Sequence, residues 1–128
     1  MAKGHRSQIK KERNQNKDTR PSAKLSYARM SAQKAGFVLD AIRGKDVQTA
    51  LGILAYNPRY ASSVIEKLLK SAIANAENNH NLDKAKLYVK EAYVNDGPVL
   101  KRSVPDSRGR IAKNDHRTSH VTVVVAER

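Results

Sequence analysis

The sequence contains no cysteine, no tryptophan and a single phenylalanine. The lack of cysteine excludes disulfides, thiolate zinc sites and cysteine nucleophiles. No stretch reaches the roughly 18 apolar residues of a membrane-spanning helix, and the N-terminus lacks the apolar segment of a secretory signal. Aromatic residues make up only 5% of the chain, so the core has to be mainly aliphatic. The lack of cysteine is compatible with a reducing cytoplasm, where we expect the protein, and no segment is expected to span a membrane.

Acidic residues are scarce relative to basic ones. Asp and Glu number 12 against 25 Lys and Arg, which gives a formal charge of +13 and a pI near 10.2. Such an excess predicts a polyanionic partner, most commonly a nucleic acid backbone, with an anionic membrane surface as the main alternative. The excess is concentrated in residues 1–24, with eight basic and two acidic residues, and in residues 99–120, with six and two. A merely solvated surface would mix the signs, as residues 81–98 do.

The N-terminal segment has no hydrophobic period. After Met1 it holds one large aliphatic residue, Ile9, which cannot offset the entropy of ordering the backbone. We expect residues 1–24 to be a disordered basic tail that orders only on its partner. A transit peptide is the alternative, and Glu12 and Asp18 argue against it. The tail residues predicted to bind nucleic acid are Lys3, Arg6, Lys10, Lys11, Arg13, Lys17 and Arg20.

Residues 25–128 are expected to form one domain with three helices. Ser31 is typical of the N-cap of the first helix, and Gly44 suits the left-handed position after its end. Asp46 is the expected cap of the second helix. Asn57 as N-cap and Pro58 as first helical residue are expected to start the third.

The third helix has the most regular pattern in the chain. Apolar residues recur at i, i+3, i+4, i+7 and i+8, the spacing of one helix face, which predicts packing against a core. The stripe consists of Ala61, Val64, Ile65, Leu68, Leu69, Ala72, Ile73 and Ala76.

A period of two predicts strands in three places. Residues 24–30 form a short strand, and residues 87–94 pair with 120–126, with a bulge near Lys90 or Glu91. Between the last two lies a turn cluster expected to centre near Ser107, with arms pairing 99–104 and 110–115. The fold class is thus α+β: three helices on an antiparallel sheet of about three strands, with a long protruding hairpin over about residues 85–126.

No catalytic, cofactor or metal site is predicted. His116 and His120 are four apart, but on a strand that spacing separates them by about 13 Å. Ser119 and His120 point to opposite faces of a strand and cannot share a proton readily. Arg43 and Lys45 could contact phosphate or complement a helix C-terminus. Because the basic segments contain no aromatic residue, we expect phosphate and shape contacts rather than base stacking.

Four runs of residues resemble the bacterial ribosomal protein L-twenty-two family of the large subunit. They are Asp40–Lys45, Asn57–Arg59, Ser71–Glu77 and Arg117–His120, the last followed by an alternating valine strand. The resemblance covers about residues 25–128. At the tip the family usually has basic residues where this chain has Val104 and Asp106.

The resemblance implies a function that the composition alone cannot give. It implies binding to large-subunit ribosomal RNA, contacts with neighbouring ribosomal proteins, and a hairpin tip that lines the nascent-peptide exit tunnel and meets the nascent peptide. The alternative is a general basic nucleic-acid-binding protein. The implied tip is Val104, Pro105, Asp106, Ser107, Arg108, Gly109, Arg110 and Ile111. Beyond the tail, the expected RNA-binding residues are Lys34, Arg43, Lys45, Arg59, Lys101, Arg102, Arg108, Arg110, Lys113, Arg117, Thr118, Ser119 and His120.

Overall fold

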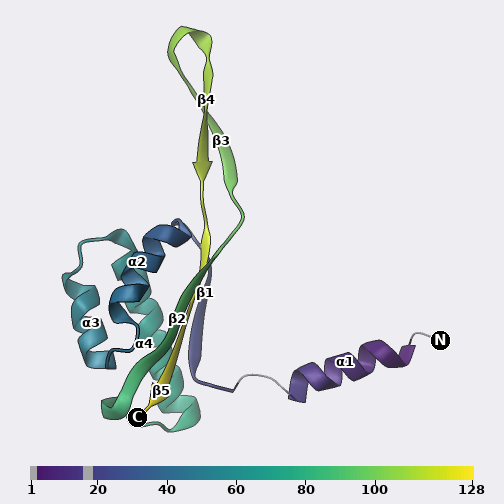
Figure 1. Ribbon diagram of the computed structural model, residues 1–128, viewed down its shortest axis with the longest axis vertical. Helices are drawn as coiled ribbons and strands as arrows, with labels where there is room; N and C mark the ends of the chain where they lie inside the picture. Colours follow the sequence, from purple (N-terminus) through teal and green to yellow (C-terminus); the bar gives the residue numbers. More distant parts are fainter. Residues whose placement is uncertain (1–2, 16–18) are drawn as a thin grey trace.

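The computed structural model describes residues 3–15 and 19–128. The fold has a body of three helices on a three-stranded sheet, from which a two-stranded hairpin projects (Figure 1). In chain order the elements are α1 (Lys3–Gln15), β1 (Ser22–Ala28), α2 (Ala32–Ile42), α3 (Val47–Tyr56), α4 (Tyr60–His80), β2 (Leu87–Asp96), β3 (Leu100–Pro105), β4 (Ile111–His116) and β5 (Ser119–Glu127), with short 3-10 turns at Lys84–Lys86 and Ser107–Gly109. The predicted α+β class is confirmed.

The body sheet is antiparallel with β5 in the centre, in the order β1-β5-β2. The β2–β5 pairing runs from Leu87 opposite Glu127 to Asp96 opposite Ser119, and its register shifts between Val89 and Glu91. This shift confirms the bulge predicted near Lys90. Helices α2, α3 and α4 cover one face of the sheet (Figure 1).

Helix α4 presents the predicted apolar stripe to the core. Ile65, Leu69 and Ala72 are completely buried, and Val64 alone of the stripe is only partly covered. Helix α2 also starts and ends as predicted. The Ser31 side chain accepts a hydrogen bond from the Lys34 amide, and Gly44 has a φ of 75° directly after the C-cap.

The start of α4 differs from the prediction. The helix begins at Tyr60, two residues after Pro58, and Asn57 is the C-cap of α3. The Asn57 side chain instead accepts the amide of Arg59, which keeps Arg59 extended and delays the helix. Asp46 occupies the expected cap position of α3, yet its carboxylate lies 3.3 Å from Arg128 and caps no amide.

The hairpin is a separate two-stranded sheet. Leu100 pairs with His116 and Pro105 with Ile111, so the tip centres on Arg108, one residue later than predicted. Residues 97–99 and 117–118, which we call the neck, join this sheet to the body. At the neck the Gly97 amide donates to the Thr118 carbonyl at 2.9 Å, and the Thr118 hydroxyl donates to the Pro98 carbonyl at 2.6 Å.

The N-terminal segment differs from the expectation of no regular structure, because Lys3–Gln15 forms helix α1. The helix stands away from the body (Figure 1). An isolated helix of this length is marginal in water, so ordering on a partner stays a prediction. Strand β1 begins at Ser22, inside the segment assigned to the tail, and the Pro21 carbonyl already accepts the Val125 amide.

Candidate nucleic-acid interface

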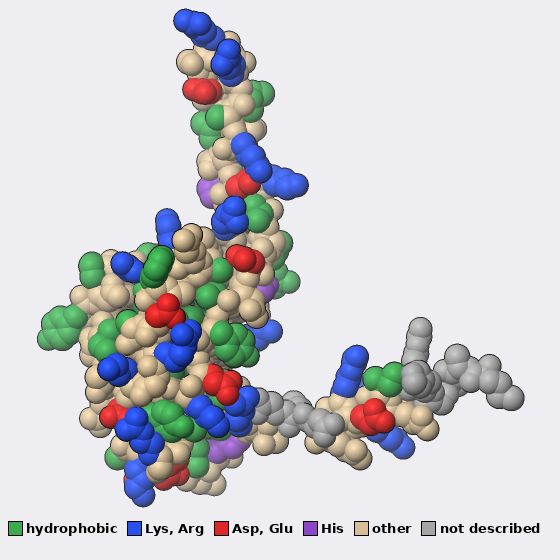
Figure 2. Space-filling view, in the orientation of Figure 1, with side chains coloured by type: hydrophobic (Ala, Val, Ile, Leu, Met, Phe, Trp, Pro, Cys, Tyr) green, Lys and Arg blue, Asp and Glu red, His purple; other side chains and the backbone are tan. Residues whose placement is uncertain are grey.

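The hairpin beyond the neck is exposed throughout. Every residue from 101 to 114 lies at the surface, and Lys and Arg side chains are spread from the neck to the tip (Figure 2). Carboxylates interrupt this basic surface at Asp106 and Asp115, and Asp115 pairs with Lys113 at 2.9 Å. The exposed cations on the arms and tip are Lys101, Arg102, Arg108, Arg110 and Lys113.

The tip is a tight turn held by its own backbone. The Asp106 amide donates to the Arg110 carbonyl at 2.8 Å, and the Asp106 carboxylate accepts the Ser107 amide at 2.7 Å. Arg108 and Gly109 both have positive φ, 55° and 69°. Glycine suits this second left-handed position, because it carries no Cβ to clash. The turn thus presents the Arg108 side chain at the extremity of the hairpin.

Two apolar side chains are exposed beside the tip. Val104 is 43% exposed and Ile111 is 76% exposed, on opposite arms of the hairpin. Apolar groups at the end of a hairpin with no core behind them indicate a surface that meets something other than water.

Three of the predicted RNA-binding residues are buried or held by internal contacts. Thr118 is buried at the neck and Ser119 at the start of β5, so their side chains are not part of the exposed basic surface. The Arg43 guanidinium donates to the Ala92 carbonyl at 2.8 and 3.1 Å and pairs with Asp40 at 2.9 Å. It therefore fastens α2 to β2, a role that neither of the two predicted interpretations included.

His120 is half-buried at the start of β5. Its Nδ1 accepts the amide of Tyr27 at 3.0 Å, and the two rings meet edge to face with centroids 4.7 Å apart. Because Nδ1 is an acceptor in this arrangement, the neutral ring carries its proton on Nε2. That leaves Nε2–H as the group of His120 that can donate outward.

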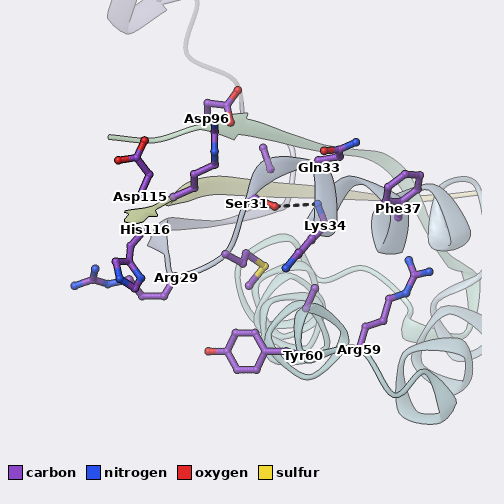
Figure 3. A pocket seen from close by; sticks show the side chains of 14 residues that line it. Arg29, Ser31, Gln33, Lys34, Phe37, Arg59, Tyr60, Asp96, Asp115 and His116 are labelled. Atoms are coloured by element: carbon purple, nitrogen blue, oxygen red, sulfur yellow. Dashed lines mark hydrogen bonds between the residues drawn. The ribbon is translucent and has the colours of Figure 1, made fainter. Parts of the chain in front are cut away.

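The structure gathers three of the predicted RNA-binding residues in one groove. Lys34 on α2 and Arg59 before α4, both labelled in Figure 3, line it together with Arg117 at the neck. Arg29, which follows β1, and the exposed aromatic rings of Phe37 and Tyr60 also line the groove, and none of the three was predicted as a site residue. For Tyr60 the sequence did carry a signal, because this aromatic residue lies outside the apolar stripe of its helix.

The N-terminal segment is only partly described. Lys10, Lys11 and Arg13 are exposed on α1, while the side chains of Lys3 and Arg6 and the whole of Lys17 lie outside the described residues. Arg20 forms an ion pair with Glu91 of β2. Lys45, at the end of the α2–α3 turn, is exposed.

Residues 3–15 and 19–128 contain no group of three or more His, Asp or Glu side chains placed to hold a metal ion. Within the same ranges, no helix combines the length and the hydropathy that crossing a bilayer requires.

The chain is similar to known ribosomal proteins. The family model described as Ribosomal protein L22p/L17e matches residues 23–126. The chain is 70% identical to the large ribosomal subunit protein uL22 of Lachnoclostridium phytofermentans and 67% identical to that of Lachnospira eligens, each over the full length of both chains. It is 58% identical to the uL22 protein of Carboxydothermus hydrogenoformans over 83% of this chain and 94% of that one. The chain therefore belongs to the ribosomal protein L22p/L17e family.

Proposed function

We propose that the chain binds large-subunit ribosomal RNA through its hairpin, its groove and its N-terminal segment, and that the hairpin tip lines the nascent-peptide exit tunnel. Membership of the family makes the chain a structural constituent of the large ribosomal subunit rather than an enzyme. Its place is accordingly in the ribosome, in the cytoplasm.

The exposed hairpin is the observation that carries the proposal. A two-stranded hairpin is marginal in water unless it packs on something, and residues 101–114 pack on nothing within the described chain. Their excess of cations favours a polyanion as the missing support. Phosphate contacts fix register and orientation, which suits a protein whose role is to hold folded RNA in place.

The exposed apolar side chains of Val104 and Ile111 support the second part of the proposal. A phosphate backbone alone would leave Ile111 without an apolar partner. A nascent peptide passing the tip brings varied side chains past the same point. The remaining expected partners are neighbouring ribosomal proteins.

The RNA part is tested by equilibrium binding across a salt series, with large-subunit ribosomal RNA and mixed-sequence duplex DNA as ligands. We expect ribosomal RNA binding to persist at salt concentrations that release the DNA. Arg110→Ala should weaken binding and reduce the salt slope by about one, whereas Lys67→Ala, on the exposed face of α4, should not. Equal loss of both ligands with salt would leave only a general basic nucleic-acid-binding protein.

The tunnel part is tested by photo-crosslinking from position 111 in ribosomes stalled with a labelled nascent chain. We expect a crosslink between the hairpin tip and the nascent chain. The same crosslinker at Lys67 serves as the control and should give none. Crosslinks from position 111 to RNA alone would refute the tunnel contact while leaving RNA binding intact.

A further inference from the structure

The groove beside the neck is large and built from segments far apart in the sequence. Its volume is about 1230 Å³. The loop after β1, the N-terminal ends of α2 and α4, and the neck of the hairpin line it (Figure 3). Compact small-molecule sites have volumes of about 300–1,000 Å³, so a groove of this larger volume suits a segment of a polymer.

We propose that this groove binds a nucleotide turned out of folded RNA, with its phosphate on the groove's cations and its base against the ring of Tyr60. This proposal rests on the proposed function and adds to it a mode of recognition, base stacking, that the basic segments of the sequence do not suggest.

The cations of the groove are available to a phosphate. Arg29, Lys34 and Arg117 are exposed, and within the described residues none of the three takes part in an ion pair. This distinguishes them from Arg43, whose guanidinium is held by Asp40 and Ala92. Arginine is well suited to phosphate because its planar fork can donate two parallel hydrogen bonds.

Two helices open onto the groove with their N-terminal ends. Ala32 and Gln33 come from the first turn of α2, and Tyr60 and Ala61 from the first turn of α4. The first turn of α2 is capped by Ser31, whereas the side chain of Arg59, the N-cap residue of α4, makes no capping hydrogen bond. The positive ends of the two helix dipoles add to the attraction for an anion supplied by the arginines.

Aromatic rings flank the same cations. Tyr60 is 66% exposed and Phe37 is 59% exposed, and the Arg59 guanidinium lies over the Phe37 ring at 5.8 Å (Figure 3). Exposed rings beside cations are the arrangement in which proteins stack unpaired bases. Arg59 is held by Phe37, whereas no ring contact occupies Tyr60 among the described residues, so the base is assigned to Tyr60.

Two carboxylates also line the groove and indicate which part of a nucleotide faces them. Asp96 and Asp115 would repel a phosphate but accept hydrogen bonds from a base amine or a ribose 2′-hydroxyl. The Oδ1 atom of Asp115 is buried and has no hydrogen-bond partner in the structure. Because the cations and the hydrogen-bond acceptors of the groove lie on different elements, the groove suits a whole nucleotide better than a phosphate group alone.

The test uses the full chain and protein-free large-subunit ribosomal RNA. The main variant is Tyr60→Ala, with Tyr60→Phe to keep the ring and Tyr56→Ala as an exposed aromatic outside the groove. Arg117→Ala is compared with Lys67→Ala. Because all four side chains are exposed, circular dichroism should show an unchanged fold. Binding is measured across a salt series, and base edges are probed with dimethyl sulfate.

We expect Tyr60→Ala to weaken binding about 5- to 150-fold without changing the salt slope, and to restore the reactivity of one or a few bases that the wild type protects. Tyr60→Phe and Tyr56→Ala should behave as wild type. Arg117→Ala should lower both affinity and salt slope.

Wild-type affinity of Tyr60→Ala for this RNA would overturn the stacking proposal while the proposed function stood. Intact RNA binding with weakened association to neighbouring ribosomal proteins would also overturn it, by assigning the groove to a protein. Failure of the wild type itself to prefer ribosomal RNA over duplex DNA would instead refute the proposed function.

Discussion

The amide of Tyr27 donates a hydrogen bond to Nδ1 of His120, 93 residues away in the sequence, at 3.0 Å. Tyr27 has a φ of 57°, a conformation that costs a non-glycine residue energy and needs support from its surroundings. The residue lies where the β1–β5 register shifts, so the ladder supplies no regular partner for its amide. His120 is therefore a structural residue of the sheet as well as a candidate RNA contact.

Removal of the imidazole should destabilise the body. We expect His120→Ala to lower the free energy of unfolding by about 0.5–1.5 kcal/mol, since one hydrogen bond and one ring contact are lost. His116→Ala, at an exposed position without such a bond, is the control. Urea denaturation measures both, and equal stability of the two variants would contradict the supporting role.

Gly97 permits the close approach of chains at the neck. A Cβ there would lie 2.5 Å from the Thr118 hydroxyl oxygen and 3.2 Å from the Thr118 backbone. We expect Gly97→Ala to cost about 1–3 kcal/mol. Gly52→Ala is the matched control: it meets nothing within 4 Å in α3 and should stabilise by about 0.5–1 kcal/mol. Thermal melts that shift the same way for both would show that the neck tolerates the extra methyl group.

Leu69 lies at the centre of the α4 stripe and is fully buried. Truncation to alanine removes apolar contacts and leaves a cavity, so Leu69→Ala should cost about 2–5 kcal/mol. Lys67→Ala, two residues earlier on the exposed face, should change stability by less than about 0.5 kcal/mol. Denaturant titration of the pair is the measurement, and an unchanged midpoint for Leu69→Ala would contradict the core assignment.

The N-terminal segment should be dispensable for folding. A chain that starts at Thr19 keeps the Arg20–Glu91 ion pair and the Pro21–Val125 hydrogen bond, so its melting temperature should match that of the full chain. Its affinity for ribosomal RNA should fall and its salt dependence should become shallower, because basic residues are lost. Circular dichroism and binding report the two effects separately, and a lowered melting temperature would mean that α1 supports the body.

Asp106 combines a charge that opposes phosphate with a carboxylate that caps the tip. Asp106→Asn removes the charge and keeps an oxygen that can accept the Ser107 amide, so we expect tighter binding to ribosomal RNA with the turn unchanged. Asp106→Lys adds a cation but loses the cap, and should tighten binding with a less ordered tip. Salt-series binding distinguishes them, and weaker binding of Asp106→Asn would show that the charge has a partner on the ribosome.

Local features could be predicted from the sequence where they depend on one residue type and its near neighbours. The α4 stripe, the Ser31 cap and the positive φ of Gly44 depend on neighbours within a few residues. The start of α4 was predicted wrongly because Asn57 can bond either a helix amide or the nearer amide of Arg59, and the sequence does not rank the two.

Features that depend on distant segments could not be predicted. The burial of Thr118 results from the approach of Gly97 across the neck. The groove exists because the fold brings Lys34, Arg59 and Arg117 together.

The neck has a mechanical consequence. Arg108 lies eleven positions after Gly97, which at roughly 3.3 Å per position places the tip about 36 Å from the two neck hydrogen bonds. At that radius, a rotation of about 10° at the neck would sweep the tip through about 6 Å, more than the spacing between neighbouring strands. The Gly97–Thr118 and Thr118–Pro98 hydrogen bonds thus set the orientation of the hairpin relative to the body, and a small change in their geometry gives a larger displacement at the tip.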